Sequence, residues 1–346
     1  MAGIDLHIQR YAFLALAAAA LFGASTPVAK LLLGELPPLG LAGLLYLGSG
    51  VGLLAVLVLR RQFARGEAGS KEAALARWDY AWLAGAVIAG GGVAPVLLLW
   101  GLSGTGASEA SLLLNFEGVI TMLIAAALFR EAVGRRVWAA AALMLAGGLV
   151  LSWQPGTAFE LSPHALAIVG ACLCWALDNN LTRKISASDP VVLAMVKGLA
   201  AGSFNLALAY ALGMEFPASA TLAAALALGF LGYGVSLVLF ILALRHLGAA
   251  RTAAHFSTAP FIGAAIAILV LGETLTASFV TALILMLAAT WLVLTERHAH
   301  EHGHEQIAHS HRHTHDEHHQ HAHRHEHPPL THSHSHLPDL HHRHRH

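Results

Sequence analysis

The chain has 346 residues, of which 56% are hydrophobic and only 12% are charged, and its formal net charge is zero. A soluble domain needs a charged surface, so this composition excludes an ordinary soluble globular protein and predicts an integral membrane protein. The sequence also argues against an enzyme, because no paired carboxylates, nucleophile elbow or nucleotide-binding loop is evident. Nothing in it favours a nucleic-acid partner.

Apolar segments of bilayer length follow one another along the first 295 residues. About 20 apolar residues cross a hydrocarbon core of about 30 Å. We therefore predict an all-α membrane protein whose ten spans follow a short cytoplasmic N-terminus at 1–10. The predicted spans are 11–33, 38–59, 80–102, 107–129, 137–153, 164–182, 190–212, 220–244, 249–271 and 276–295.

Lysine and arginine are concentrated in alternate loops. The loops between these basic ones offer little beyond Lys30. Because cytoplasmic loops carry the excess of Lys and Arg, this pattern predicts both termini in the cytoplasm, in a bacterial-type inner membrane. The basic positions are Arg10, Arg60, Arg61, Arg65, Lys71, Arg77, Arg130, Arg135, Arg136, Arg183, Lys184, Arg245, Arg251 and Arg297.

The sequence contains an internal repeat. LFGASTPVAK (21–30) resembles CWALDNNLTRK (174–184) when Phe22 is set on Trp175, and LFREAVG (128–134) resembles VLGETLT (270–276) with Glu131 on Glu273. The two halves, 11–153 and 164–295, hold five predicted spans each. An external linker at 154–163 separates them. Since five is odd, the second half is expected to be inverted in the membrane, a common transporter architecture.

Two longer stretches carry a family resemblance. GASEASLLLNFEGVITMLIAAALFREAVG (106–134) and GAARTAAHFSTAPFIGAAIAILVLGETLT (248–276) resemble the fourth helices of EamA-type transporters in the drug/metabolite transporter superfamily. The resemblance covers roughly residues 10–295 and implies a transporter. Two features depart from the family pattern. Glu117 and Gly118 stand where the family often has a proline, and Leu45 and Tyr46 stand where it often has an arginine.

Ionisable and polar side chains inside the predicted spans are the candidates for chemistry. An ionisable group near the bilayer midplane costs at least about 2.5 kcal/mol, so Glu117 is expected to bind a cationic substrate or couple protons, and the alternative is a structural carboxylate. Asp178 is expected to pair with Lys197 or Arg183 as one gate, the alternative being an ordinary helix end. The candidate substrate or coupling residues are Glu117, Lys197, Asp178, Asn179, Asn115, Tyr46 and His255.

Helix-breaking residues and two carboxylates mark the mechanical positions. Pro27, Pro95 and Pro260, with the glycines at 90–92 and 229–234, are expected to break helices beside a cavity or to pack helices closely. Glu131 and Glu273 each precede a new helix and are expected to cap its backbone N–H groups as structural corners.

The segment 296–346 is predicted to be a disordered, His-rich cytoplasmic tail. It carries 21 His between positions 298 and 346. Imidazole suits Zn²⁺, Ni²⁺ and Co²⁺, so the tail is expected to bind metal, the alternatives being a solvated tail or a proton buffer. No cofactor is required elsewhere. The candidate ligands are His298, His300, His302, His304, His309, His311, His313, His315, His332, His334 and His336.

These observations leave three hypotheses for function. The first is a secondary transporter, an exporter or permease, that moves a small metabolite through the lipid bilayer by alternating access. The second is a transition-metal transporter regulated by the tail, and the third is a metal-buffering or sensing protein that transports nothing. A homodimer is compatible with all three.

Overall fold

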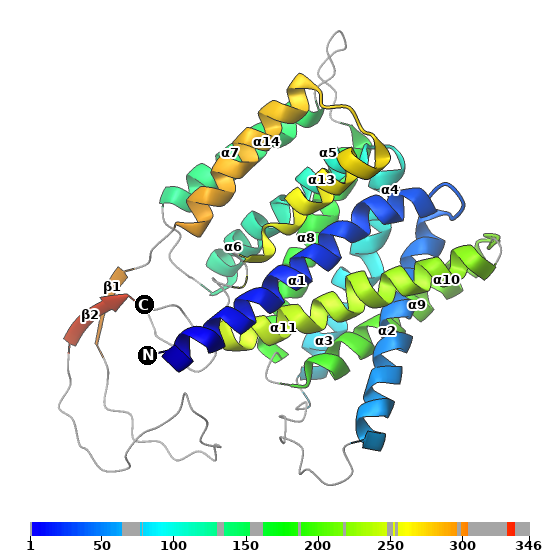
Figure 1. Cartoon of the computed structure of the whole chain (residues 1–346), viewed down its shortest axis with the longest axis horizontal. Helices are drawn as coiled ribbons and strands as arrows, with labels where there is room; N and C mark the ends of the chain where they lie inside the picture. Colours follow the sequence, from blue (N-terminus) through cyan, green and yellow to red (C-terminus); the bar gives the residue numbers. More distant parts are fainter. Residues whose placement is uncertain are drawn as a thin grey trace. The chain divides into compact units, whose positions relative to one another are not determined.

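A computed structural model describes residues 2–63, 77, 79–129, 135–152, 162–185, 188–216, 219–247, 252, 255–295, 299–303 and 331–335 (Figure 1). The chain divides into two compact units, Met1–Glu296 and Arg297–His346. The first unit is helical in its described residues, and the second holds two short strands.

Helical segments of the first half correspond to the first five predicted spans, and several extend past the predicted bounds. The first helix begins at Ala2, inside the stretch 1–10 that was expected to precede the first span, and the second continues to Phe63. The two longest are continuous, whereas the third and fourth are divided into shorter pieces. The elements are α1 (Ala2–Leu32), α2 (Pro38–Phe63), α3 (Asp79–Ala86), η1 (Val87–Val93), α4 (Ala94–Ser103), α5 (Ala107–Leu113), α6 (Phe116–Phe129) and α7 (Arg135–Ser152).

The second half repeats this arrangement. Two long continuous helices are followed by a span divided into three pieces. The elements are α8 (Pro163–Ile185), α9 (Pro190–Ala211), α10 (Ser219–Leu228), η2 (Gly229–Val235), α11 (Ser236–Leu247), α13 (Ala259–Leu271) and α14 (Ala277–Leu294).

Six of the described helical segments are long and apolar enough to cross a bilayer. They are Gln9–Leu32, Pro38–Arg60, Asp79–Ser103, Pro163–Thr182, Pro190–Ala211 and Ala220–Ala243. Trp138–Leu151, Ala259–Leu271 and Ala277–Leu292 are shorter apolar helices. The chain is therefore a multi-span helical membrane protein.

Two segments of π-helix occupy equivalent places in the two halves. η1 and η2 each have seven residues and begin 142 positions apart, the same offset that relates Glu131 to Glu273. Both contain the glycines that were expected to break helices. A π-helix shifts the backbone hydrogen bonds by one residue and occurs mostly at functional sites.

The fourth predicted span is interrupted at its centre. α5 ends at Leu113 and α6 starts at Phe116, with a turn at Leu114 and Asn115 between them. Glu117 thus lies in the first turn of α6 rather than in the middle of a continuous helix. The hydropathy of the whole segment does not indicate this break, because most residues on both sides of it are apolar.

The two halves interdigitate instead of lying side by side as separate bodies. α1 packs on α11 and α13 of the second half, and α8 packs on α4 and α6 of the first. α2 packs closely on α9, where a methyl group added at Gly198 or Gly202 would reach the backbone of α2. α7 lies beside α14 (Figure 1).

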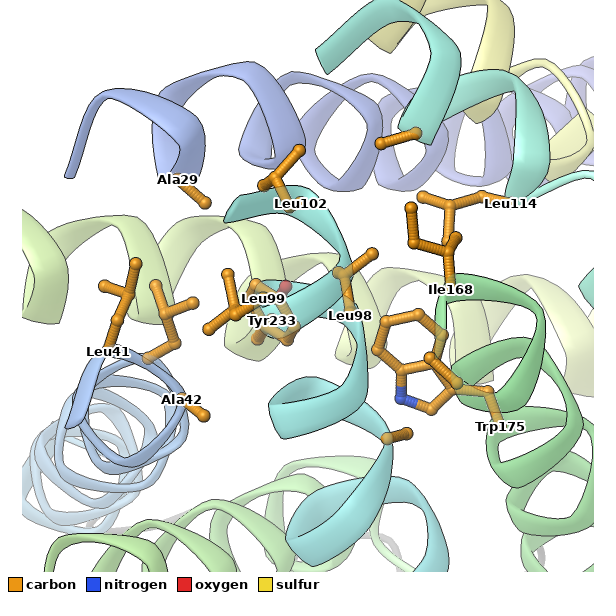
Figure 2. Close-up of a cluster of buried hydrophobic side chains, with 14 of the residues drawn as sticks. Ala29, Leu41, Ala42, Leu98, Leu99, Leu102, Leu114, Ile168, Trp175 and Tyr233 are labelled. Atoms are coloured by element: carbon orange, nitrogen blue, oxygen red, sulfur yellow. The ribbon is translucent and has the colours of Figure 1, made fainter. Parts of the chain in front are cut away.

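A large apolar cluster joins α1, α2, α4 and α8. Figure 2 shows its buried side chains, among them Ala29, Leu41, Leu99, Leu102 and Ile168. Because these residues lie near the end of α1, the start of α2 and the end of α4, the cluster fills one side of the helical unit.

The second unit contains a short antiparallel ladder. β1 (Ala299–Gly303) pairs with β2 (Thr331–Ser335), placing His300 opposite His334 and His302 opposite His332. At these ten positions the structure differs from the predicted disorder. Alternating sequences satisfy the period of two that a strand requires. The other tail residues lie outside the described ranges.

Candidate functional site

A cavity of about 80 Å³ lies inside the helical unit and is lined by residues of both halves. The lining combines aromatic rings, small residues and three charged side chains. It consists of Phe22, Tyr46, Ser49, Glu117, Trp175, Asp178, Asn179, Ala194, Lys197, Gly198, Gly232, Tyr233, Ser236, Leu237, Phe240 and Phe256.

The cavity is displaced toward one face of the helical unit. We call this the basic face, because the helix ends that carry Arg10, Arg60, Arg135 and Lys184 lie there. Lining residues of α9 come from its first half, beginning at Ala194, and those of α11 from the segment that runs toward this face. The apolar cluster of Figure 2 begins at Trp175 and Tyr233, which also line the cavity, and continues to the opposite side of the unit. The structure is therefore closed on the side away from the basic face.

A buried ion pair joins α8 and α9 at the cavity wall. Lys197 Nζ donates to Asp178 Oδ1 at 2.6 Å and to Oδ2 at 2.7 Å, and the two residues are only 3% and 6% exposed. Thr182 Oγ1 donates to Asp178 Oδ1 at 2.8 Å. Lys197 is one of the two partners predicted for Asp178, and the side chain of the other, Arg183, lies outside the described residues. A buried charge requires a partner and full hydrogen bonding, and both members of this pair have them.

Glu117 contacts the cavity from the first turn of α6. Asn179 Nδ2 donates to Glu117 Oε1 at 2.8 Å, so this carboxylate accepts a hydrogen bond from an uncharged amide. A carboxylate in the first turn of a helix is favoured by the helix dipole. This position supplies partial positive charge to Glu117 without neutralising it.

The backbone of η1 forms another wall of the site. Tyr46 Oη donates to the Gly90 carbonyl at 2.5 Å, and Trp175 Nε1 donates to the same oxygen at 3.0 Å. Asn205 Nδ2 donates to the Gly91 carbonyl at 3.2 Å. A methyl group added at Gly90 would overlap the Asp178 carboxylate. The glycine thus lets the ion pair approach the π-helix, whose carbonyls receive donors from α2, α8 and α9.

Six aromatic rings of the lining form one continuous cluster. Tyr46 lies 5.5 Å from Tyr233, which lies 5.8 Å from Phe22, measured between ring centroids. Phe22 lies 5.7 Å from Trp175 and 5.6 Å from Phe256, and Phe256 lies 4.8 Å from Phe240. The rings come from both halves, so no single segment of sequence contains the cluster.

A second polar cluster closes the face opposite the basic one. Glu273 Oε1 accepts from Ala107 N at 2.7 Å, and Oε2 accepts from Ser108 N at 2.8 Å. Lys30 Nζ donates to the carbonyls of Leu102 at 2.5 Å and Thr105 at 2.8 Å. Glu273 thus caps α5 of the first half, and not α14 as predicted. Glu131 lies outside the described residues.

Burial alone would raise the pKa of the Glu273 carboxyl. Hydrogen bonds from Ser108 and Ala107, together with the charge of Lys30, outweigh burial and hold the pKa below its ordinary value of 4.5. The carboxylate is therefore ionised at neutral pH, as a cap requires.

Two predicted site residues do not line the cavity. Asn115 is buried and donates to the Leu112 carbonyl at 2.9 Å, within its own turn between α5 and α6. His255 precedes α13, and the neighbouring Phe256 faces the cavity instead. The helix-break positions differ as well: α1 continues through Pro27, while Pro95 follows η1 and Pro260 lies in the first turn of α13.

The sequence had offered partial signals for the residues that were missed. Phe22 and Trp175 were aligned in the internal repeat, and their rings meet at the cavity. Ser49, Phe240 and Tyr233 carry no signal that separates them from ordinary packing residues. Within the described residues, no group of three or more His, Cys, Asp or Glu is arranged to hold a metal ion.

A multi-span helical protein with a partly polar cavity shared by two interleaved halves belongs to the class of membrane transporters. The model of the EamA-like transporter family matches the chain twice, over residues 9–153 and 162–295, and the chain belongs to that family. An uncharacterized transporter of Methanothermobacter thermautotrophicus is 28% identical over 263 residues, which cover 73% of this chain and 76% of that protein.

A crystal structure of another protein shares the fold, with a TM-score of 0.60 and 19% sequence identity. The match covers 82% of this chain and 96% of the other. The match to the family model confirms the family resemblance that was inferred from the fourth helices, and the uncharacterized transporter agrees with it.

Proposed function

We propose that the protein is a secondary transporter, an exporter or permease, that moves a small metabolite by alternating access. The observation that carries the proposal is the cavity of Glu117, Asp178 and Lys197, lined by both halves and displaced toward one face. Alternating access requires a central site that each face reaches in turn, and inverted repeats supply the two related states.

The arrangement of the chain supports ten spans in two inverted halves. The family model matches once in each half, and the π-helices η1 and η2 occupy equivalent places. By the distribution of Lys and Arg, we place the basic face and both termini on the cytoplasmic side of a bacterial-type inner membrane. The cavity then lies nearer the cytoplasmic face, and the apolar cluster separates it from the external face.

Transport is tested first by finding a cargo. Purified full-length protein is screened for thermal stabilisation by a panel of small metabolites, and each hit is assayed for accumulation in proteoliposomes. We expect at least one hit to be transported, and the flux to fall at least about tenfold in Glu117→Gln, because an ionisable residue at this depth is functional by default. Binding without any flux in either direction would overturn the proposal.

We also propose that the His-rich tail binds Zn²⁺, Ni²⁺ or Co²⁺. The register of β1 and β2 supports this, since it sets two His of each strand directly opposite two of the other. Titration of full-length protein with NiCl₂ or ZnCl₂, beside a variant ending at Thr295, tests it. Equal metal uptake by the two proteins would contradict the proposal.

The same truncation separates the alternatives. If metal tolerance of a deletion strain requires both the tail and Glu117, the protein is a metal transporter. If it requires the tail alone, the protein buffers or senses metal. The cavity favours neither of these readings, because its described polar side chains are two carboxylates, one amide, one lysine, and hydroxyl and indole groups, with no His or Cys among them.

A further inference from the structure

The charges that line the cavity do not cancel. Asp178 and Lys197 neutralise each other through two short contacts. Glu117 has the amide of Asn179 as its hydrogen-bond donor, which brings no charge. With both carboxylates ionised, the three charged groups sum to one negative charge. A buried carboxylate must be either protonated or paired with a positive charge. One bound cation would therefore neutralise the site.

The nature of that cation follows from the rest of the lining. A metal ion needs several oxygen, nitrogen or sulfur ligands, whereas the remaining walls are mainly aromatic and aliphatic. Rings attract organic cations through their negative faces, and clusters of rings are the usual cage for substituted ammonium groups. The six connected rings therefore favour an ammonium group bound to carbon.

The lining also argues against a zwitterion or an anion. Lys197 is the one cationic side chain among the described lining residues, and its Nζ is already bound to Asp178 at 2.6 Å and 2.7 Å. A carboxylate or phosphate on the ligand would have to break this pair. The hydroxyl of Ser236 donates to the Ala18 carbonyl at 2.8 Å and is also engaged.

We propose that the cavity binds a monovalent organic ammonium ion with an apolar body. Its charge lies against Glu117 and the rings of Phe22, Trp175 and Tyr233. A cavity of about 80 Å³ holds the head group, and the apolar body extends along Leu237, Phe240 and Phe256 toward the basic face. As a statement about cargo the inference rests on the proposed function, but ligand binding can be measured without transport.

The probe is benzyltrimethylammonium, whose charge is independent of pH, and its uncharged comparison is benzyl alcohol. Binding to purified full-length protein is measured by isothermal titration calorimetry. We expect benzyltrimethylammonium to bind at least about tenfold more tightly than benzyl alcohol. Glu117→Gln should weaken the binding of benzyltrimethylammonium at least about tenfold. Glu215→Gln, an exposed carboxylate between α9 and α10, is the matched control and should bind normally.

The rings are tested with Phe22→Leu and Phe256→Leu, which keep apolar volume while removing the aromatic face. We expect each to weaken benzyltrimethylammonium about 3- to 30-fold and benzyl alcohol less. Phe204→Leu, on the exposed surface of α9, should change neither. These variants also decide the matter if Glu117→Gln fails to fold.

Undetectable binding at millimolar probe, equal affinity for the two probes, or unchanged affinity in both ring variants would overturn the inference. Binding of the ammonium without transport would leave it standing and count against the proposed function instead. Transport of a metabolite together with undetectable ammonium binding would support the proposed function and overturn the inference about the ligand.

Discussion

Phe22 and Trp175 lie edge to face at the cavity, with their ring centroids 5.7 Å apart and their planes at 77°. They are also the two residues that the internal repeat aligns with each other. Equivalent positions of inverted halves can meet only close to the axis that relates the halves. Under the proposed inversion of the two halves, the contact places their pseudo-symmetry axis beside the cavity.

The ion pair of Asp178 and Lys197 gives the first prediction. Asp178→Asn or Lys197→Met alone leaves one charge buried without a partner, so each should lower the free energy of unfolding by about 3–5 kcal/mol. The double variant should lose much less than the sum. Denaturant unfolding in detergent, followed by far-UV circular dichroism, gives the double-mutant cycle. Additive losses would mean that the pair is not coupled in the folded protein.

The three consecutive glycines of η1 give a second prediction, and one of them serves as its control. Gly90→Ala should destabilise the protein by about 1–3 kcal/mol, because the new methyl group would overlap the Asp178 carboxylate. Gly92→Ala should be neutral or stabilising, since its methyl would lie 3.7 Å from the Val87 carbonyl and alanine favours helix. Melting temperatures of the two variants decide it, and equal values would contradict the described packing around Gly90.

Much of this architecture could be predicted from local sequence. The helices correspond to the predicted apolar segments, although several extend past the predicted bounds, because hydropathy is a property of the segment itself. Glu117, Asp178 and Lys197 stood out because charged residues inside such segments are expensive. Their depth alone could not show that Lys197 pairs with Asp178, because that contact depends on how α8 packs against α9.

Other features depend on contacts between distant segments. Glu273 was expected to cap the helix that follows it, yet it caps α5 on the other half of the chain. The aromatic cluster combines rings from separate helices, each of which looks like a packing residue in its own segment. Asn115 looked like an intramembrane polar site, whereas its amide satisfies a carbonyl at the break between α5 and α6.

The Glu273 cap gives a third prediction, concerning pH and access. Its pKa is lowered in the folded state, so its stabilising contribution is present above the ordinary value of 4.5 and is lost as the pH falls through the lower folded value. Glu273→Gln should cost about 1 kcal/mol at pH 7 and less at pH 3. A difference between wild type and variant that does not shrink toward pH 3 would contradict the role of the carboxylate.

The same substitution should favour the state open to the opposite face. With Cys172 and Cys174 replaced by Ala, Ser236→Cys reports on the cavity and Glu215→Cys on the exposed opposite face. We expect Glu273→Gln to increase labelling of the cavity cysteine by an impermeant maleimide added at that face. Labelling of the control cysteine should not change. An unchanged cavity signal would mean that this cluster does not hold the closed face.

The Gly90 carbonyl gives the last prediction, because it accepts two side-chain donors. Tyr46→Phe leaves the bond from Trp175, and Trp175→Phe leaves the bond from Tyr46, so each should cost only about 1 kcal/mol through the lost hydrogen bond. Trp175→Phe also removes part of a buried ring, so its cost should be the larger of the two. The double variant takes both side-chain donors from a carbonyl at the cavity wall, and it should cost more than the sum of the two single variants, by about 1 kcal/mol or more.

Tyr233→Phe, whose ring lies in the same cluster but whose hydroxyl is not bound to Gly90, is the matched control. Additive losses from unfolding measurements on the double variant would mean that water or another donor replaces both side chains at η1.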